Sequence, residues 1–196
     1  SSRRRHTRYQ SLSRGLGDVY KRQGLDHILA SPKDLGEVCM IVRRPDTDQR
    51  EVLESCELDS LDGLVGDNWR TRGSRRTEDG SAHPDMQLNI MNARVIELVA
   101  AEPERWPLAG DQFYVDLDLG MDNLPEGSRL TIGTALIEVT AEPHLGCDKF
   151  VDRFGRDAMQ FVNSEPGKAH RLRGLNAKVI RPGMVAVGDR IIKGGA

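Results

Sequence analysis

The sequence predicts a mostly β fold, a closed or nearly closed β-barrel with a few helical insertions. Short stretches of alternating apolar and polar residues recur along the chain, which is the pattern of half-buried strands. Twenty glycines and nine prolines mark turns between these stretches. Regular helical crossovers are missing between the strands, which argues against a doubly wound parallel sheet. Many short strands with only two or three helices therefore favour a barrel.

Composition limits the class of protein. A chain of 196 residues with 38% hydrophobic content can build one domain with a full core. No apolar run approaches the roughly 20 residues that span a bilayer, so no membrane partner is expected. Three widely spaced cysteines without a C-x-x-C pair argue against a zinc ribbon, a thioredoxin-type redox pair and a disulfide framework. This cysteine usage fits a reducing compartment, and we expect a cytoplasmic protein.

Residues 1–23 differ from the rest of the chain. They hold seven of the 28 Lys and Arg residues, one of the 30 Asp and Glu residues, and no sustained hydrophobic period. A basic arm or an Arg-rich transit peptide would have this composition, but the residues look most like translated sequencing-adapter read-through. We expect a non-native or disordered segment. The remaining chain has 21 basic and 29 acidic residues, which argues against a nucleic-acid partner.

The first part of the domain is expected to begin with a hairpin. Residues 24–35 are interpreted as a linker, and the domain itself is predicted over residues 36–193. A strand is predicted over residues 38–43, where Val38, Met40 and Val42 alternate with Cys39, Ile41 and Arg43. Turn-forming residues follow at 44–48, and residues 51–58 can return as a second strand. The two cysteines in these strands, Cys39 and Cys56, are interpreted as packing residues.

A tight loop and a polar loop follow. Residues 61–69 combine two glycines with Asp67 and Trp69, but they lack the G-K-[ST] and G-x-G-x-x-G patterns of phosphate loops. Asp67 can therefore brace a turn or serve as a site residue. Residues 70–85 are rich in Gly, Ser, Asp and Arg, which predicts an exposed, mobile loop. Its arginines either face solvent or fold over an anionic ligand.

The remaining elements follow from the same patterns. Asn92 can cap a helix over residues 93–101, which Pro103 and Pro107 end. Arg171 and Arg173 alternate with Leu172, as in a strand with a solvent face, although both could meet a phosphate. Further strands are predicted over residues 87–91, 113–119, 129–132, 135–140, 177–180, 184–187 and 190–192.

One stretch carries most of the possible chemistry. Residues 143–150, PHLGCDKF, join a strand to a helical pattern in which Phe150, Phe154 and Ala158 lie four residues apart and which ends near residue 163. Cys147 therefore falls near the first turn of a helix, where unpaired N–H groups favour a thiolate. A small cysteine buried under the phenylalanines is the alternative. Residue chemistry alone slightly favours that alternative, because cysteine is so often buried.

Two neighbours of Cys147 affect its chemistry. Lys149 can add positive charge beside the thiol, whereas Asp148 opposes that effect. His144 could accept a proton or act as a second ligand, although a structural, hydrogen-bonding histidine is the more frequent case.

Several blocks of the sequence resemble the MOSC domain family in the correct order. The resemblance covers roughly residues 36–193 and implies a mostly β barrel of the pyruvate-kinase β-barrel type. The blocks at 110–125 are similar to a bacterial stand-alone branch. The matching blocks are LVGDNW at 64–69, QLNIMNARV at 87–95, GDQFYVDLDL at 110–119, NLP at 123–125, PHLGCDKFVDRF at 143–154 and the closing strands at 179–189.

The resemblance implies a cofactor and a site. The family is named after the C-terminal domain of molybdenum cofactor sulfurase, and its motif cysteine binds molybdenum in amidoxime-reducing and hydroxylamine-reducing relatives. By resemblance, Cys147 is the metal ligand and catalytic residue of a molybdenum cofactor (molybdopterin) site. Lys149, Arg153, Asp67 and His144 are expected to bind the cofactor, although no motif assigns the cations. Pyridoxal phosphate is expected only on a separate partner domain, if at all.

Three functions remain open at this point. The first is a molybdenum-dependent oxidoreductase that reduces an N-hydroxylated small molecule and takes electrons from a partner protein. The second is a sulfur carrier, in which Cys147 holds a persulfide from a sulfur-donor protein and passes it to a metal–sulfur centre. The third is a non-catalytic module that holds a small anion or a protein partner through the barrel and the loop at 70–85.

Overall fold

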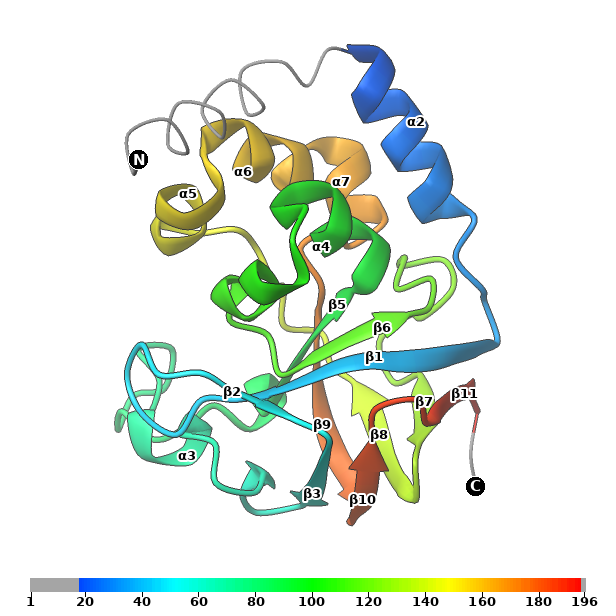
Figure 1. The fold of residues 1–196 in the computed structure, drawn as a ribbon. Helices are drawn as coiled ribbons and strands as arrows, with labels where there is room; N and C mark the ends of the chain where they lie inside the picture. Colours follow the sequence, from blue (N-terminus) through cyan, green and yellow to red (C-terminus); the bar gives the residue numbers. More distant parts are fainter. Residues whose placement is uncertain (1–17, 195–196) are drawn as a thin grey trace.

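A sheet that closes on itself is the centre of the computed structural model, which describes residues 18–194, with side chains from residue 23 onward (Figure 1). Seven strands follow one another around the barrel, and the last pairs with the first. This closed barrel confirms the predicted fold class. In spatial order the strands are β1 (Leu35–Arg43), β6 (Phe113–Asp116), β5 (Leu88–Asn92), β9 (Leu175–Arg181), β8 (Ala135–Val139), β7 (Arg129–Ile132) and β11 (Arg190–Lys193).

Strand β11 closes the barrel. Its residue Ile192 lies opposite Leu35 of β1, and Ile191 lies opposite Gly36. On its other side β11 pairs with β7. The predicted hairpin of β7 and β8 is present, with Gly133 at its turn in the left-handed region (φ 55°).

The two parallel strands of the barrel explain its main helical insertion. β5 and β6 pair in parallel, whereas the other pairs of the barrel are antiparallel. A parallel pair needs a crossover connection, here α4 (Ala93–Ala100) and the 3-10 helix η2 (Pro103–Ala109). As predicted, the Asn92 side chain caps α4 by accepting a hydrogen bond from the Arg94 N–H.

The expected hairpin partner of β1 is divided between two sheets. β2 (Glu51–Leu53) pairs with β1, but β3 (Ser55–Asp59) joins β10 (Gly183–Ala186) and β4 (Gly63–Leu64) in a three-stranded sheet. The single strand predicted over residues 51–58 is therefore wrong. The change of sheet at residue 54 buries Cys56 and Leu58 in the barrel core.

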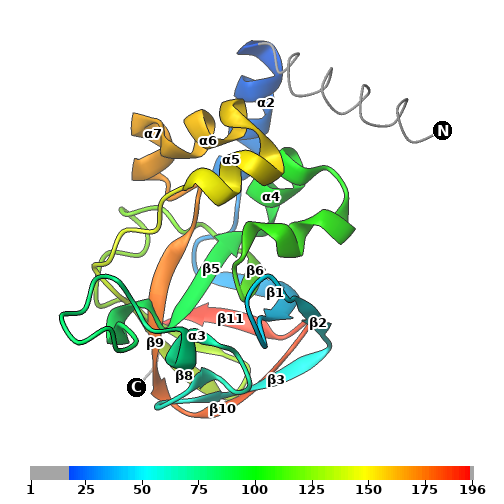
Figure 2. The same ribbon diagram turned by 90° about the vertical axis from the view of Figure 1, so that its left-hand side faces the viewer.

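Helices cover one end of the barrel (Figure 2). α4 lies beside three short helices that follow one another along the chain, α5 (Asp148–Phe154), α6 (Arg156–Asn163) and α7 (Glu165–Ala169). A second apolar cluster, which includes Phe150, Phe154 and Val162, lies beneath them. The short helix α3 (Trp69–Arg72) follows β4 along the chain, and η1 (Pro84–Met86) packs against β9. None of the helices in the described residues has the length and apolar character needed to cross a membrane.

The linker expected over residues 24–35 is replaced in part by a helix. α2 spans Asp18–Leu29, so residues 24–29 are helical. Ile28 is buried in the second apolar cluster, and Leu25, one turn earlier, packs against that cluster. Tertiary packing of this kind stabilises short helices whose own pattern is weak. Residues 18–23 of the segment expected to be disordered belong to α2, and residues 1–17 lie outside the described residues.

Candidate functional site

Cys147 is exposed at the start of α5. It occupies the N-cap position with an extended backbone (φ −123°, ψ 179°), and its side chain caps no backbone N–H. Its carbonyl oxygen accepts hydrogen bonds from the amides of Phe150 (2.9 Å) and Val151 (3.1 Å). Phe150 and Phe154 are buried, but the cysteine is not packed beneath them. The buried alternative for Cys147 is therefore wrong, and its thiol can reach a ligand.

The chain before Cys147 is held by side-chain hydrogen bonds. The Gly146 amide donates to Oδ1 of Asn163 (2.9 Å), and Nδ2 of Asn163 donates back to the Gly146 carbonyl (3.1 Å). His144 donates from Nε2 to Oδ1 of Asp111 (2.7 Å). The same carboxylate also forms an ion pair with Arg173 through its other oxygen (2.6 Å). The segment that carries the cysteine is thus fixed to α6 and to the barrel.

Burial decides the ionisation of this cluster. Burial and the positive charge of Arg173 lower the pKa of His144, and they outweigh the attraction of Asp111. Burial would raise the pKa of Asp111, but Arg173 and His144 together lower it below its ordinary value. Asp111 is therefore a carboxylate and His144 a neutral imidazole at neutral pH.

Asp67 forms a buried ion pair with Arg44. Its carboxylate receives two hydrogen bonds from the Arg44 guanidinium (2.8 and 2.9 Å), and the amides of Arg44 and Trp69 also donate to it (both 2.9 Å). Arg44 further donates to Oδ1 of Asn89 (2.9 Å) and to the Gly110 carbonyl (2.9 Å). Asp67 thus braces the loop beneath α3.

The two predicted cations share one acidic partner. Nζ of Lys149 lies 3.5 Å from Oδ1 of Asp48, and Nη2 of Arg153 lies 3.2 Å from the same oxygen. The aspartate belongs to the loop between β1 and β2, so this loop contacts the first helix after the cysteine. Arg153 also donates to the Leu108 carbonyl (2.7 Å).

Two further arginines form no ion pair within the described part of the chain. Arg50 was missed by sequence reasoning, whereas Arg72 is one of the loop arginines expected to face solvent or an anionic ligand. Arg50 donates only to the backbone carbonyls of Gln49 and Pro107, and Arg72 forms no ion pair. Burial, followed by the charges of Arg153 and Arg44, lowers the pKa of Arg50. Burial and then Arg44 lower that of Arg72. Positive charge is thus concentrated between the β1–β2 loop and α3, a proximity for which the sequence offered no signal.

The polar loop at 70–85 is attached to the cysteine segment. Nη1 of Arg76 lies 2.6 Å from Glu142, and Nε2 of His83 lies 3.7 Å from the other oxygen of the same carboxylate. The Glu142 carbonyl accepts a hydrogen bond from the buried Asn176 (3.0 Å). Part of the expected mobile loop is therefore anchored two residues before His144.

Two sequence interpretations of arginines need correction. Arg173 is buried and ion-paired, and Leu172 beside it is also buried, so residues 171–173 are not a strand with a solvent face. Arg171 lies in a turn with a positive φ of 46° and donates to the Leu124 carbonyl (2.5 Å). The alternation was misleading because the chain reverses here before β9 begins.

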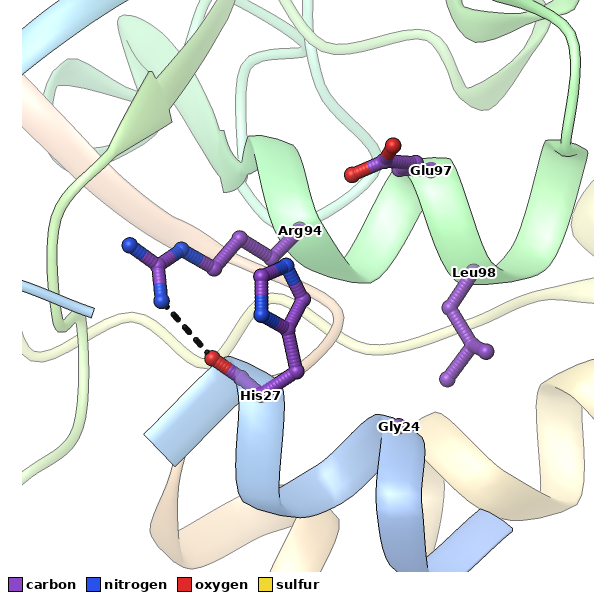
Figure 3. Close-up of a pocket in the computed structure, with 5 residues that line it drawn as sticks. All are labelled: Gly24, His27, Arg94, Glu97 and Leu98. Carbon is purple, nitrogen blue, oxygen red and sulfur yellow. Dashed lines mark hydrogen bonds between the residues drawn. The ribbon is translucent and has the colours of Figure 1, made fainter. Parts of the chain in front are cut away.

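A shallow pocket lies elsewhere. It has a volume of about 210 Å³ between α2 and α4 and is lined by Gly24, His27, Arg94, Glu97 and Leu98 (Figure 3). Arg94 donates to the His27 carbonyl across it (2.8 Å). The pocket shares no residue with the cysteine segment. Among the residues described, no group of three or more His, Cys, Asp or Glu side chains is placed to hold a metal ion.

Fold and site together define a β-barrel domain with an exposed cysteine at the start of α5, the helix that also carries Lys149 and Arg153. The family model described as "MOSC domain" matches residues 77–192, more than half of the sequence. The chain belongs to the MOSC domain family, as the sequence resemblance predicted. No match was found among curated proteins.

Solved structures support the fold. The YuaD protein of Bacillus subtilis superposes with a TM-score of 0.62 at 18% identity, over 83% of this chain and 97% of that one. YiiM of Escherichia coli gives a TM-score of 0.52 at 20% identity, over 82% and 70% of the two chains. YiiM of Geobacillus stearothermophilus gives 0.51 at 15% identity, over 82% and 75%. At these identities the similarity shows the barrel and its helical cover alone.

Proposed function

We propose that this protein binds a molybdenum–pterin cofactor through the Cys147 thiolate and reduces N-hydroxylated small molecules. The observation that carries the proposal is the exposure of the cysteine within a MOSC domain. A cysteine that served packing would be buried like Cys56, whose pKa burial raises to about 12.

The residues present fit such a cofactor. A soft thiolate suits a molybdenum centre, and a single protein thiolate suits a metal that arrives with sulfur ligands on its pterin. The cofactor also carries a phosphate, which binds guanidinium groups strongly. Arg50 and Arg72 form no ion pair within the described residues, whereas Lys149 and Arg153 both contact Asp48. We therefore assign the phosphate to the first two arginines.

The reaction divides between cofactor and protein. When bound, the molybdenum centre supplies the two electrons that break the N–O bond of the substrate. The reduction also takes up two protons and releases an amine and water, so an electron-donor protein must restore the electrons. The chain itself holds the metal at Cys147 and the phosphate at the arginines. His144 cannot supply a proton readily at neutral pH, because its lowered pKa keeps it neutral.

Metal analysis tests the proposal. The protein is produced in a host that makes the molybdenum cofactor, and molybdenum is measured by mass spectrometry for the wild type, Cys147→Ala and Cys39→Ala. We expect about one molybdenum per chain in the wild type and in the Cys39 variant, because Cys39 lies in β1 outside the site. The molybdenum content of Cys147→Ala should be at least tenfold lower than that of the wild type.

Other outcomes distinguish the alternatives. Equal molybdenum in wild type and Cys147→Ala contradicts ligation by the cysteine. A persulfide on Cys147 without molybdenum would indicate the sulfur carrier instead. If neither metal content nor persulfide depends on this residue, the domain is a non-catalytic binding module.

The phosphate assignment has its own test. The double variant Arg50→Gln with Arg72→Gln should hold at least tenfold less pterin cofactor after gel filtration, because it loses two cations that form no ion pair within the described residues. Arg70→Gln is the matched control, since Arg70 lies in the same helix, α3, and is exposed like Arg72, but is paired with Asp62 (2.7 Å). Unchanged retention in the double variant would show that the phosphate lies elsewhere.

A further inference from the structure

A single arginine contacts the supports on both sides of Cys147. Arg173 precedes β9 and is buried. Its Nη1 lies 2.6 Å from Oδ2 of Asp111, whose other oxygen holds His144, three residues before the cysteine. Its guanidinium carbon lies 5.0 Å from the ring centroid of Phe150, three residues after the cysteine.

The guanidinium is fixed in this place by the barrel. Its Nη2 donates to the Ala109 carbonyl (2.8 Å), and the chain beside it approaches β5 closely at Gly174. That glycine has a φ of 117°, and a Cβ there would collide with the Ile90 carbonyl and lie 3.1 Å from the His144 ring. Arg173 therefore has little freedom to move independently of β5 and β9.

The contact with Phe150, on the C-terminal side of Cys147, depends on the planar shape of the guanidinium. A flat cation over an aromatic face gains electrostatic attraction and close packing, and a lysine ammonium reproduces the charge but not the plane. Phe150 is 2% exposed and packs against Phe154 (centroids 4.9 Å apart). Since the Phe150 amide binds the Cys147 carbonyl, the position of this ring also determines the position of the cysteine backbone.

We propose that Arg173 is a positioning residue for Cys147, acting through Asp111 and His144 before the cysteine and through Phe150 after it. This role rests on the proposed function, because positioning Cys147 matters for a metal ligand that must be held in one geometry. The effect of Arg173 on the cysteine segment does not depend on a bound metal. Loss of Arg173 loosens the cysteine segment while the barrel remains folded.

Amide hydrogen exchange in the metal-free protein tests this. Three amides report on the segment, namely Gly146, bonded to Asn163, and Phe150 and Val151, both bonded to the Cys147 carbonyl. Arg173→Lys keeps a charge for Asp111 but removes the plane over Phe150. We expect at least tenfold faster exchange at Phe150 and Val151, with Gly146 within twofold of the wild type.

A second variant should show the reverse pattern. His144→Ala removes the contact with Asp111 but leaves Arg173 over Phe150. Exchange should then accelerate at least tenfold at Gly146, and stay within twofold at the two amides after the cysteine. Arg171→Lys is the matched control, because this arginine lies two residues from Arg173 yet contacts the Leu124 carbonyl instead. It should change none of the three amides.

A double variant that removes both buried charges controls for unfolding caused by a single unpaired charge. Asp111→Asn with Arg173→Met leaves neither a buried acid nor a buried cation, and it should accelerate exchange on both flanks. Exchange within twofold of the control at all three amides overturns the proposal, as does equal acceleration throughout β5 and β9. Molybdenum content of the same variants is a separate measurement. A wild type without molybdenum contradicts the proposed function but leaves the exchange result intact.

Discussion

At the scale of single residues, buried ion pairs organise the region around the cysteine. Arg44 with Asp67 and Arg173 with Asp111 both lie almost entirely out of solvent. A buried ion pair is costly to break because each charge depends on the other, and each pair here has further hydrogen bonds. Removing one member therefore leaves an uncompensated charge in the interior.

Asp67→Ala should destabilise the protein strongly. The Asp67 side chain has no exposed surface and the Arg44 side chain is 4% exposed, so the arginine charge would be left unpaired. We expect the free energy of unfolding to fall by about 3–5 kcal/mol, measured by urea denaturation. Asp62→Ala is the control, because its pair with Arg70 is about half exposed and should contribute at most about 1 kcal/mol. Equal losses of unfolding free energy in the two variants would show that burial of the Asp67–Arg44 pair adds nothing to its contribution.

The lowered pKa of His144 predicts a dependence of stability on pH. The unfolded chain binds a proton at this histidine near pH 6.5, whereas the folded protein resists protonation because of burial and Arg173. The histidine's contribution to stability is present above about pH 6.5 and is lost as the pH falls towards the folded pKa.

The wild type should therefore lose more stability than His144→Gln between pH 7 and pH 5. Urea denaturation at several pH values measures both slopes, and the other histidines cancel in the comparison. Parallel slopes would show that His144 titrates alike in the folded and unfolded states.

At the scale of elements, one glycine divides the helical region after the cysteine. The sequence pattern predicted one helix ending near residue 163, but the structure has α5 and α6 with Gly155 between them. Gly155 adopts φ 91° and ψ 163°, a conformation essentially confined to glycine. The break turns α6 so that Asn163 reaches back to Gly146.

Gly155→Ala should lower the free energy of unfolding by about 1–3 kcal/mol. A Cβ at this position would meet no atom within 4 Å, so the cost arises from the backbone alone. Thermal and urea denaturation provide the measurement. Gln160→Ala, at an exposed position of α6, should change stability by no more than about 0.5 kcal/mol. A neutral Gly155 variant would show that α5 and α6 can join without strain.

At the scale of the whole molecule, closure of the barrel depends on its last strand. Neighbouring residues of β11 face opposite sides of the sheet: Ile191 is fully buried in the barrel core, and Ile192 is 44% exposed. β11 is bonded to the first strand on one side and to β7 on the other. This arrangement makes the two isoleucines a matched test of the inside and the outside of the barrel.

Ile191→Ala should reduce the free energy of unfolding by about 2–5 kcal/mol, since it leaves a cavity among packed side chains. Ile192→Ala should change it by about 0.5 kcal/mol or less. Chemical denaturation measures both. Similar losses would show that the barrel interior is not packed at this strand.

The sequence alone determined the alternating strands, the Asn92 cap and the family blocks, because these depend on neighbours within a few residues. It also marked Cys147, since its motif is contiguous. It failed where distant segments meet. The change of sheet at residue 54 follows from burial of Cys56 and Leu58, and Arg50 and Arg72 came together only through folding.

Only the tertiary structure decided the state of the cysteine. A cysteine before a helix can be buried or exposed, and local pattern cannot distinguish the two cases because both place the same phenylalanines in the core. Here Phe150 packs beneath Arg173, and Asp111 and Asn163 hold the chain ahead of the helix, so the thiol remains outside. Those contacts join residues far apart in sequence, and burial gives them their strength.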